Sequence, residues 1–351
     1  MRPDEDPIAH AGDLIAAGRA AAAAAFLEGL LAAGRGGLLM RLTLVRALRA
    51  AANAQSALAV AREAAALHPD IAVVAIALGE AMLDLGLLPT AIGEFQRALR
   101  IDSGNEDARR GLARAWLEAG EPDKALEALE ALGGVQPLVE EANAMKAAPR
   151  SNARYVRHLF DQFSSDYDAR MIGRLGYRAP AILRELFDLT IASARLSVLD
   201  LGCGTGLSGA AFRDVARTLD GFDLSPAMIE KARRRGIYDG LAVADIETAL
   251  DGSKLYDLIM AADTLVYLGD LAAVFAGAAR SLKPGGHFLF TAERKDGEGF
   301  ELGPKRRWRH SETCLREEAA RAGFEVASLM ACSPRSEAGV PVEGLAVALS
   351  R

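Results

Sequence analysis

An apolar run that ends in closely spaced glycines constrains the fold of this chain more than any other feature. The run reads LSVLDL from Leu196, and GCGTG and the helical pattern SGAAFRDVAR follow it. Gly202, Gly204 and Gly206 allow the backbone to turn sharply and to approach a ligand where a side chain would collide. The segment therefore predicts a buried strand, a tight loop and a helix that starts at the loop.

A second apolar segment strengthens this interpretation. About twenty residues beyond the loop, the segment TLDGFDLS ends a strand at Asp223. A carboxylate at this place accepts hydrogen bonds from both hydroxyls of a ribose. A glycine loop alone is weak support for cofactor binding, whereas loop, strand and acidic residue at this separation together predict a nucleoside-containing cofactor.

The first part of the chain follows a different pattern, a repeat of about 34 residues. Residues 1–145 are rich in Ala and Leu, and Gly and Pro punctuate them. In one register, small residues recur within the second helix of each unit and glycines recur between paired helices: Ala23, Ala57, Ala91, Ala125, Gly18, Gly86 and Gly120. Small residues let paired helices approach closely, and glycines end them. The pattern resembles tetratricopeptide (TPR) repeats and predicts an all-α repeat domain.

A stacked array of such hairpins forms a concave surface that usually holds a peptide or protein. The alternative is that the array caps, shields or dimerises the following domain. The predicted partners are therefore a protein bound by the repeats or a second copy of the chain.

The repeat breaks in the stretch GGVQPLVEEANAMKAAPRSNARY, and a new pattern begins at Tyr155. We place the domain boundary near Pro149. The prediction is a repeat domain over residues 1–148 and a second domain over residues 149–351.

Residues 149–195 are expected to form helices that precede the sheet of the second domain. Aromatic residues including Phe160 and Tyr167 lie on related faces, and an amphipathic helix starts at about Pro180. The aromatic residues either pack in a core or belong to a lid over the cofactor, with the Tyr167 hydroxyl facing it.

Later motifs strengthen the assignment of the second domain. In chain order they read VLDLGCGTG, GFDLSPAMIEKAR, VADIE, YDLIMAADTLVYLGDL and LKPGGHFLFTAE. From about Tyr155 onward the chain resembles class I S-adenosylmethionine-dependent methyltransferases. The resemblance implies an α/β Rossmann-like core over residues 196–351, with a seven-stranded sheet that ends in an antiparallel pair, and S-adenosyl-L-methionine as cofactor. TPR repeats followed by FDQFSSDYD and this core also resemble a bacterial group of TPR-containing methyltransferases.

The resemblance implies roles for individual residues. The implied cofactor-binding residues are Tyr167, Asp200, Gly202, Gly204, Gly206, Asp223, Leu224, Met228, Asp245, Ile246 and Asp263. Asp200 and Gly202 would border the methionine moiety, with Asp263 near the same end. Asp223 would hold the ribose, and Asp245 would receive the adenine amino group.

A dinucleotide oxidoreductase is the competing interpretation of the glycine loop. Gly204, Gly206 and Gly209 satisfy G-x-G-x-x-G, and Asp223 has the place of an NAD-binding carboxylate. Asp200 argues against this interpretation. It stands two positions before Gly202, where a carboxylate would lie beside the pyrophosphate of NAD. The same position suits the positively charged ammonium end of S-adenosylmethionine.

Catalysis of methyl transfer requires alignment of the acceptor and exclusion of water, and a general base when the acceptor carries a proton. His310, in RRWRHSE, is the first candidate for base or substrate contact, and a loop histidine that caps the next helix is the alternative. Tyr267 is a candidate for the acceptor pocket or for core packing.

A basic cluster lies next to His310. Lys305, Arg306, Arg307 and Arg309 surround Trp308. The cluster either binds a phosphate, a carboxylate or the prosthetic arm of a carrier protein, or forms a solvated loop.

Composition excludes several other classes. The net charge of -6 argues against general binding to nucleic acid or to an anionic membrane. Cys203, Cys314 and Cys332 lack metal-ligand spacing, so no metal site is expected and a reducing cytoplasm fits. The acidic N-terminus does not resemble a signal peptide, and no apolar stretch approaches about 18 residues. A cytoplasmic protein is therefore expected.

These observations predict a methyltransferase that acts on an oxygen or nitrogen of a small molecule or carrier-borne metabolite, with the repeats serving recruitment, lidding or dimerisation. One alternative is a protein methyltransferase whose repeats bind the polypeptide substrate. The other is a non-catalytic scaffold whose core only binds the cofactor.

Overall fold

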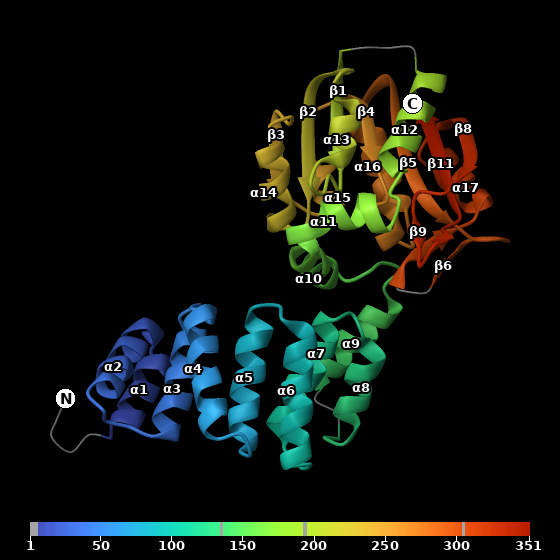
Figure 1. The fold of residues 1–351 in the computed structure, drawn as a ribbon. Helices are drawn as coiled ribbons and strands as arrows, with labels where there is room; N and C mark the ends of the chain where they lie inside the picture. Colours follow the sequence, from blue (N-terminus) through green and yellow to red (C-terminus); the bar gives the residue numbers. More distant parts are fainter. Residues whose placement is uncertain (1–5, 134–135, 192–194, 304–305) are drawn as a thin grey trace. The chain divides into compact units, whose positions relative to one another are not determined.

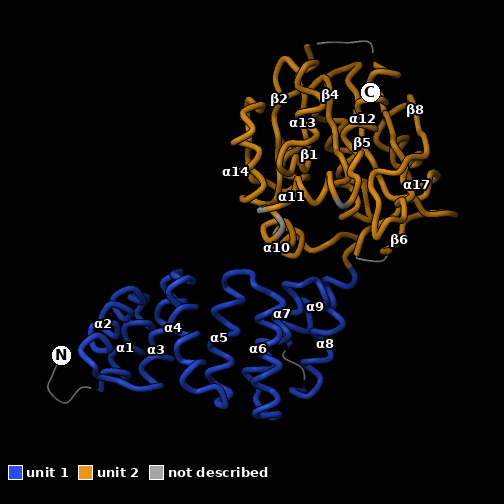
Figure 2. Tube along the Cα trace, in the orientation of Figure 1, with its two compact units in different colours: residues 1–147 blue, residues 148–351 orange. Residues whose placement is uncertain are grey.

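The chain forms two compact units, Met1–Ala147 and Ala148–Arg351, which Figure 2 shows in different colours. The computed structural model describes residues 6–133, 136–191, 195–303 and 306–351. None of the described helices combines the length and the apolar character needed to cross a membrane.

The first unit consists of stacked helices, in which each helix packs against the next along the chain (Figure 1). The helices of this unit are α1 (Pro7–Ala16), α2 (Ala20–Ala32), α3 (Leu38–Ala50), α4 (Ala54–Leu67), α5 (Ala72–Asp84), α6 (Leu88–Ile101), α7 (Glu106–Glu118), α8 (Pro122–Glu130) and α9 (Gln136–Ala147). The array of helical hairpins predicted from the repeat is confirmed.

Small residues and glycine turns make this stacking possible. The four alanines that recur in the predicted second helices are fully buried: Ala23, Ala57, Ala91 and Ala125. Gly18, Gly86 and Gly120 each adopt a left-handed conformation directly after a first helix, with φ of 73°, 69° and 71°. Because a residue with a Cβ rarely adopts this conformation, these glycines end the helices and reverse the chain.

The second unit begins with short helices and continues into a sheet (Figure 1). The elements before the sheet are α10 (Ala153–Phe163), η1 (Ser164–Asp166), α11 (Tyr167–Ala169), η2 (Arg170–Arg174) and α12 (Ala179–Thr190). The strands are β1 (Leu196–Leu201), β2 (Ala216–Asp223), β3 (Gly240–Val243), β4 (Tyr256–Ala261), β5 (Leu282–Arg294), β6 (Phe300–Leu302), β7 (Trp308–His310), β8 (Glu325–Cys332), β9 (Ser336–Glu337), β10 (Val340–Pro341) and β11 (Gly344–Ser350). The helices between them are α13 (Leu207–Phe212), α14 (Pro226–Arg235), α15 (Ile246–Ala249), η3 (Leu265–Tyr267), α16 (Ala272–Ser281) and α17 (Glu312–Arg321).

The main sheet has the strand order β3-β2-β1-β4-β5-β11-β8. Strands β3, β2, β1, β4 and β5 run parallel, and β11 runs antiparallel to both β5 and β8. The predicted Rossmann-like core with its final antiparallel pair is therefore confirmed. The structure adds one feature that the sequence did not suggest, because β7 extends the sheet beside the end of β5 and β6 pairs with β7.

Helices cover both faces of this sheet, so its central strands are apolar on both sides. In β4, Leu258 and Met260 pack toward α12 and α13, whereas Ile259 and Ala261 pack toward α15, α16 and α17. This double covering explains the unbroken apolar runs in the sequence. It also leaves the edge where the parallel strands end as the place for polar residues and a ligand.

Candidate active site

A cavity of about 580 Å³ lies at the carboxyl ends of the parallel strands. One side, which we call the cofactor side, consists of residues that follow β1, β2 and β3: Gly202, Gly204, Asp223, Leu224, Asp245 and Ile246. The other side, which we call the acceptor side, is mainly apolar and aromatic: Val156, Leu159, Phe160, Tyr167, Met171, Tyr177, Tyr267 and Leu268, with Arg307 among them. The cavity therefore joins a polar turn region to an aromatic wall.

The glycine loop has the conformation that its sequence predicts. Gly202 and Gly204 have φ of 67° and 54°, and both line the cavity. A Cβ on Gly202 would collide with the side chain of Thr264. A Cβ on Gly204 would meet no atom within 4 Å, so a larger residue there would extend into free space beside the loop. Gly206 precedes α13 with φ of 93° and does not belong to the cavity wall.

Asp223 ends β2 and is held by the backbone. Its two carboxylate oxygens accept hydrogen bonds from the Gly204 amide at 2.9 Å and the Ser225 amide at 2.8 Å. Burial raises the pKa of Asp223 to about 6, and these two amides oppose the shift. The carboxylate is thus fixed at the cavity wall, which fits the predicted contact with a ribose.

Asp200 lies near the loop without lining the cavity. Its Oδ2 accepts hydrogen bonds from the hydroxyls of Ser208 and Tyr238, both at 2.7 Å. Its Oδ1 is buried and has no hydrogen-bond partner among the described residues. Burial raises the pKa of Asp200 to about 6. The contacts connect β1 with α13 and Tyr238, so the carboxylate supports the loop from within the fold.

Asp245 and Ile246 line the cavity where β3 ends, and Arg150 contacts the Asp245 carboxylate. The Arg150 guanidinium donates to Asp245 Oδ2 at 2.7 Å and to Glu247 Oε1 at 2.8 Å. The carbonyl of Pro149 accepts hydrogen bonds from the Gly269 and Asp270 amides. No sequence motif indicates this arrangement, in which the first residues of the second unit form part of the cavity wall.

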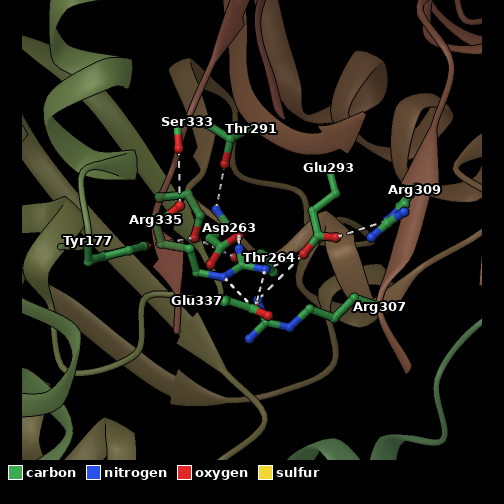
Figure 3. Close-up of polar contacts among 11 residues, drawn as sticks. Tyr177, Asp263, Thr264, Thr291, Glu293, Arg307, Arg309, Ser333, Arg335 and Glu337 are labelled. Atoms are coloured by element: carbon green, nitrogen blue, oxygen red, sulfur yellow. Dashed lines mark hydrogen bonds and ion pairs between the residues drawn. The ribbon is translucent and has the colours of Figure 1, made fainter. Parts of the chain in front are cut away.

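Asp263 follows β4 with φ of 57° and forms an ion pair with Arg335, which is 1% exposed. Arg335 also pairs with Glu293 and Glu337, as Figure 3 shows. Arg307 and Arg309 approach the same carboxylates from the segment around β7. Three guanidinium groups and three carboxylates therefore form one ion cluster, and Asp263 and Arg307 are its members at the cavity wall.

The aromatic wall packs edge to face. The ring of Phe160 lies 6.1 Å from that of Tyr167 and 5.6 Å from that of Tyr267. The Tyr177 hydroxyl donates to the Ala262 carbonyl at 3.3 Å. Burial raises the pKa of the Tyr167 and Tyr267 hydroxyls well above the usual range, so both remain protonated at neutral pH. They can donate hydrogen bonds into the cavity and cannot serve as bases.

His310 and Met228 do not line the cavity, contrary to the roles predicted for them. The ring of His310 is fully buried, and its Nε2 lies 2.9 Å from the Gly269 carbonyl, to which it donates. Burial lowers the pKa of His310 to about 4, so the ring is neutral. His310 lies in β7 and does not line the cavity, so it is not placed to contact an acceptor. This corrects its predicted role as a base. Met228 is buried in α14, and Ser225 caps this helix through the Met228 amide.

The basic cluster of the sequence divides in the structure. Arg307 lines the cavity, Arg309 pairs with Glu293 outside it, and Lys305 lies outside the described residues. The interpretation of a solvated loop is wrong for Arg307, whose side chain is only 21% exposed.

Two families match this chain. Residues 167–329 match a methyltransferase domain family, and residues 82–148 match the tetratricopeptide repeat family. An aklanonic acid methyltransferase from Streptomyces sp. (strain C5) is 34% identical over 151 residues, which cover 40% of this chain and 66% of that protein. A malonyl-[acyl-carrier protein] O-methyltransferase from Salmonella typhimurium (strain LT2) is 32% identical over 105 residues, 29% of this chain and 42% of that protein. The chain thus spans about two thirds or less of the length of these curated relatives.

Solved structures of low identity also align with the chain. The crystal structure of magnesium protoporphyrin IX methyltransferase from Synechocystis PCC 6803 with bound SAH covers 57% of this chain and all of that chain, at 16% identity and a TM-score of 0.46. The family matches agree with the motifs and the strand order found above, and the predicted cofactor class is confirmed with them. The chain therefore contains a domain of the methyltransferase family, whose cofactor is S-adenosylmethionine, and tetratricopeptide repeats precede this domain.

Proposed function

We propose that this chain transfers the methyl group of S-adenosylmethionine to an oxygen or nitrogen acceptor on a small molecule or carrier-borne metabolite. The observation that carries the proposal is the single cavity in which the turns after β1, β2 and β3 face an aromatic wall. Such a cavity has room for a nucleoside cofactor on one side and an organic acceptor on the other.

The residues of the cofactor side fit S-adenosylmethionine. Asp223 would accept hydrogen bonds from the ribose hydroxyls, and Asp245 with Ile246 would hold the adenine. Gly202 and Gly204 would admit the methionine end, since neither carries a side chain. When bound, the cofactor supplies a methyl group activated by its positively charged sulfur.

The acceptor side would orient the acceptor and exclude water. The helices α10, η1, α11 and η2 form the lid in this proposal, and polar contacts connect it to the core. Asp161 accepts a hydrogen bond from the Ser225 hydroxyl at 2.5 Å, and Asp168 pairs with Arg235 at 2.6 Å. A closed, apolar site favours methyl transfer over reaction with water. Tyr267 and Tyr167 act here as hydrogen-bond donors that position the acceptor.

The relatives support the acceptor class. The names of the two curated relatives refer to aklanonic acid and to malonyl-[acyl-carrier protein], a small molecule and a carrier-borne group. We propose that the repeats recruit the acceptor or its carrier, because stacked helical hairpins present a surface suited to proteins. We also propose a cytoplasmic location, which fits the three free cysteines.

The proposal is tested with methyl-labelled S-adenosylmethionine and an extract of the source cells. We expect label in the small-molecule fraction, or on a carrier protein from which thioester cleavage releases it. Asp223→Asn should abolish the transfer, whereas Asp214→Asn, a change of an exposed carboxylate outside the cavity, should leave it intact. Label that stays on a polypeptide after thioester cleavage would instead indicate protein methylation. Cofactor binding without any transfer would indicate the non-catalytic scaffold.

A further inference from the structure

Arg307 is one of three arginines among the described residues that line the cavity, with Arg150 and Arg170, and the acceptor side around it is mainly apolar and aromatic. It precedes β7, and its side chain is 21% exposed. Its Nη1 lies 3.3 Å from a Glu337 oxygen and 3.5 Å from a Glu293 oxygen. This nitrogen is buried and makes no hydrogen bond to the part of the chain that the structure describes. The guanidinium therefore retains donor capacity next to the cavity.

Within the described part of the ion cluster, ion pairs join as many guanidinium groups as carboxylates. Asp263, Glu293 and Glu337 face Arg307, Arg309 and Arg335 in the ion cluster of Figure 3. The cofactor would bring an additional positive charge on sulfur into the cavity. An acceptor with one negative charge would restore the balance in a buried place where unpaired charge is costly.

The cavity offers no free base for an acceptor that must lose a proton. Its described lining contains neither histidine nor lysine. Asp245 is paired with Arg150, and Asp263 is paired with Arg335. Asp223 accepts two backbone hydrogen bonds and faces the cofactor side. The site therefore suits an acceptor that arrives already deprotonated.

Resting on the proposed function, we propose that the acceptor is a carboxylate on an apolar or aromatic body, that Arg307 binds it, and that the product is a methyl ester. One carboxylate oxygen forms a bond to the methyl carbon while the bond between that carbon and sulfur breaks. The electron pair of the broken bond goes to sulfur. No proton is exchanged, so no base is required.

The guanidinium has a geometric role in this step. Two N–H groups of one guanidinium can hold a carboxylate in a fixed plane. The hydroxyls of Tyr167 and Tyr267, both at the cavity wall, can donate to the same anion. Phe160, which packs against both tyrosine rings, would contact the apolar body of the acceptor.

The first test uses the chemistry of the product. The full-length protein is incubated with methyl-labelled S-adenosylmethionine and the small-molecule and carrier fractions of a source-cell extract, and the products are treated with mild alkali. Methyl esters release the label as volatile methanol, whereas methyl ethers and methylamines retain it. Release as methanol is the expected result. Alkali-stable label would overturn the carboxylate inference and leave the proposed methyltransferase function standing. Absence of any transfer would overturn both.

The second test identifies the residue. Arg307→Gln should lower the rate of alkali-labile labelling on the order of 10- to 100-fold, because a charge-assisted hydrogen bond to the acceptor is lost. Arg213→Gln is the matched control, since this arginine pairs with Asp239 at the surface and does not line the cavity. Its labelling rate should change less than about threefold.

Two further measurements separate acceptor binding from folding. Calorimetric titration should give the same affinity for S-adenosylmethionine in wild type and Arg307→Gln, within about twofold. Arg307→Lys keeps the charge but not the planar pair of donors, and it should recover only part of the activity. Wild-type labelling by Arg307→Gln, or an equal loss in both glutamine variants, would contradict the role assigned to Arg307.

Discussion

On the cofactor side of the cavity, each residue lies at or just after the carboxyl end of a parallel strand, so its position depends on a local turn. On the acceptor side, the residues come from the segment before β1, from η3 and from the segment before β7. Backbone geometry shapes the first side, as the left-handed Gly202 and Gly204 show. Side chains that are distant in sequence shape the acceptor side, where Arg335 connects Asp263 with Glu293.

The difference implies that the two sides respond differently to substitution. A change in the glycine loop alters one turn and the ligand that approaches it. A change in the ion cluster leaves buried charges of several strands without partners.

The largest effect is expected at Arg335, on the acceptor side. Arg335→Leu would leave Asp263 and Glu293 buried without their main partner, and we expect the free energy of unfolding to fall by about 3–5 kcal/mol. Chemical denaturation measures it. Arg309→Gln removes a half-exposed partner of Glu293 and should cost about 1 kcal/mol or less. Equal losses in the two variants would show that Arg335 does not organise the acceptor side.

A smaller effect is expected at Gly202, on the cofactor side. Gly202→Ala adds a Cβ at φ of 67° and against Thr264, which should cost about 2–4 kcal/mol of unfolding free energy and weaken cofactor binding. Gly285→Ala is the control, because its φ is 75° and its Cβ would meet no atom within 4 Å. It should lose only about 1–2 kcal/mol. If the two alanine variants are equally stable, close packing at Thr264 does not restrict the loop.

The smallest expected effect is the pH dependence of cofactor binding, which again depends on the cofactor side. Burial raises the pKa of Asp223 to about 6, and Asp161 adds to the shift, while the Ser225 and Gly204 amides oppose it. Ribose hydroxyls donate to the ionised carboxylate, so cofactor binding favours that form. The affinity for S-adenosylmethionine should be constant above about pH 7 and about tenfold weaker at pH 5.

Calorimetric titration across this pH range measures the dependence. Asp223→Asn cannot ionise, so this variant should bind weakly with a much flatter profile. A wild-type affinity that increases toward pH 5 would contradict the role assigned to the ionised Asp223 carboxylate.

The cofactor side could be predicted from the sequence because its determinants are local. The glycine loop, Asp223 and Asp245 each follow a recognisable apolar strand, and the structure places all of them at one cavity. The repeat period likewise indicated the helical hairpins, since each unit contains its own turn glycine and small residues.

The acceptor side could not be predicted in the same way. Arg150 and Arg335 lie far in sequence from the carboxylates they contact, and no motif marks them. His310 was predicted as a base because the chemistry of an imidazole suits that role. Only the strand pairing of β7 with β5 and β6 shows that its ring is buried and bonded to Gly269. Local patterns therefore predict turns and strands, whereas long-range packing decides which polar side chains reach the cavity.

The most direct test of the central claim is calorimetric titration of the wild-type protein and Asp223→Asn with S-adenosylmethionine and, separately, with NADH. We expect micromolar binding of S-adenosylmethionine to the wild type, at least about tenfold weaker binding to the variant, and no binding of NADH. Binding of NADH without binding of S-adenosylmethionine would contradict this expectation.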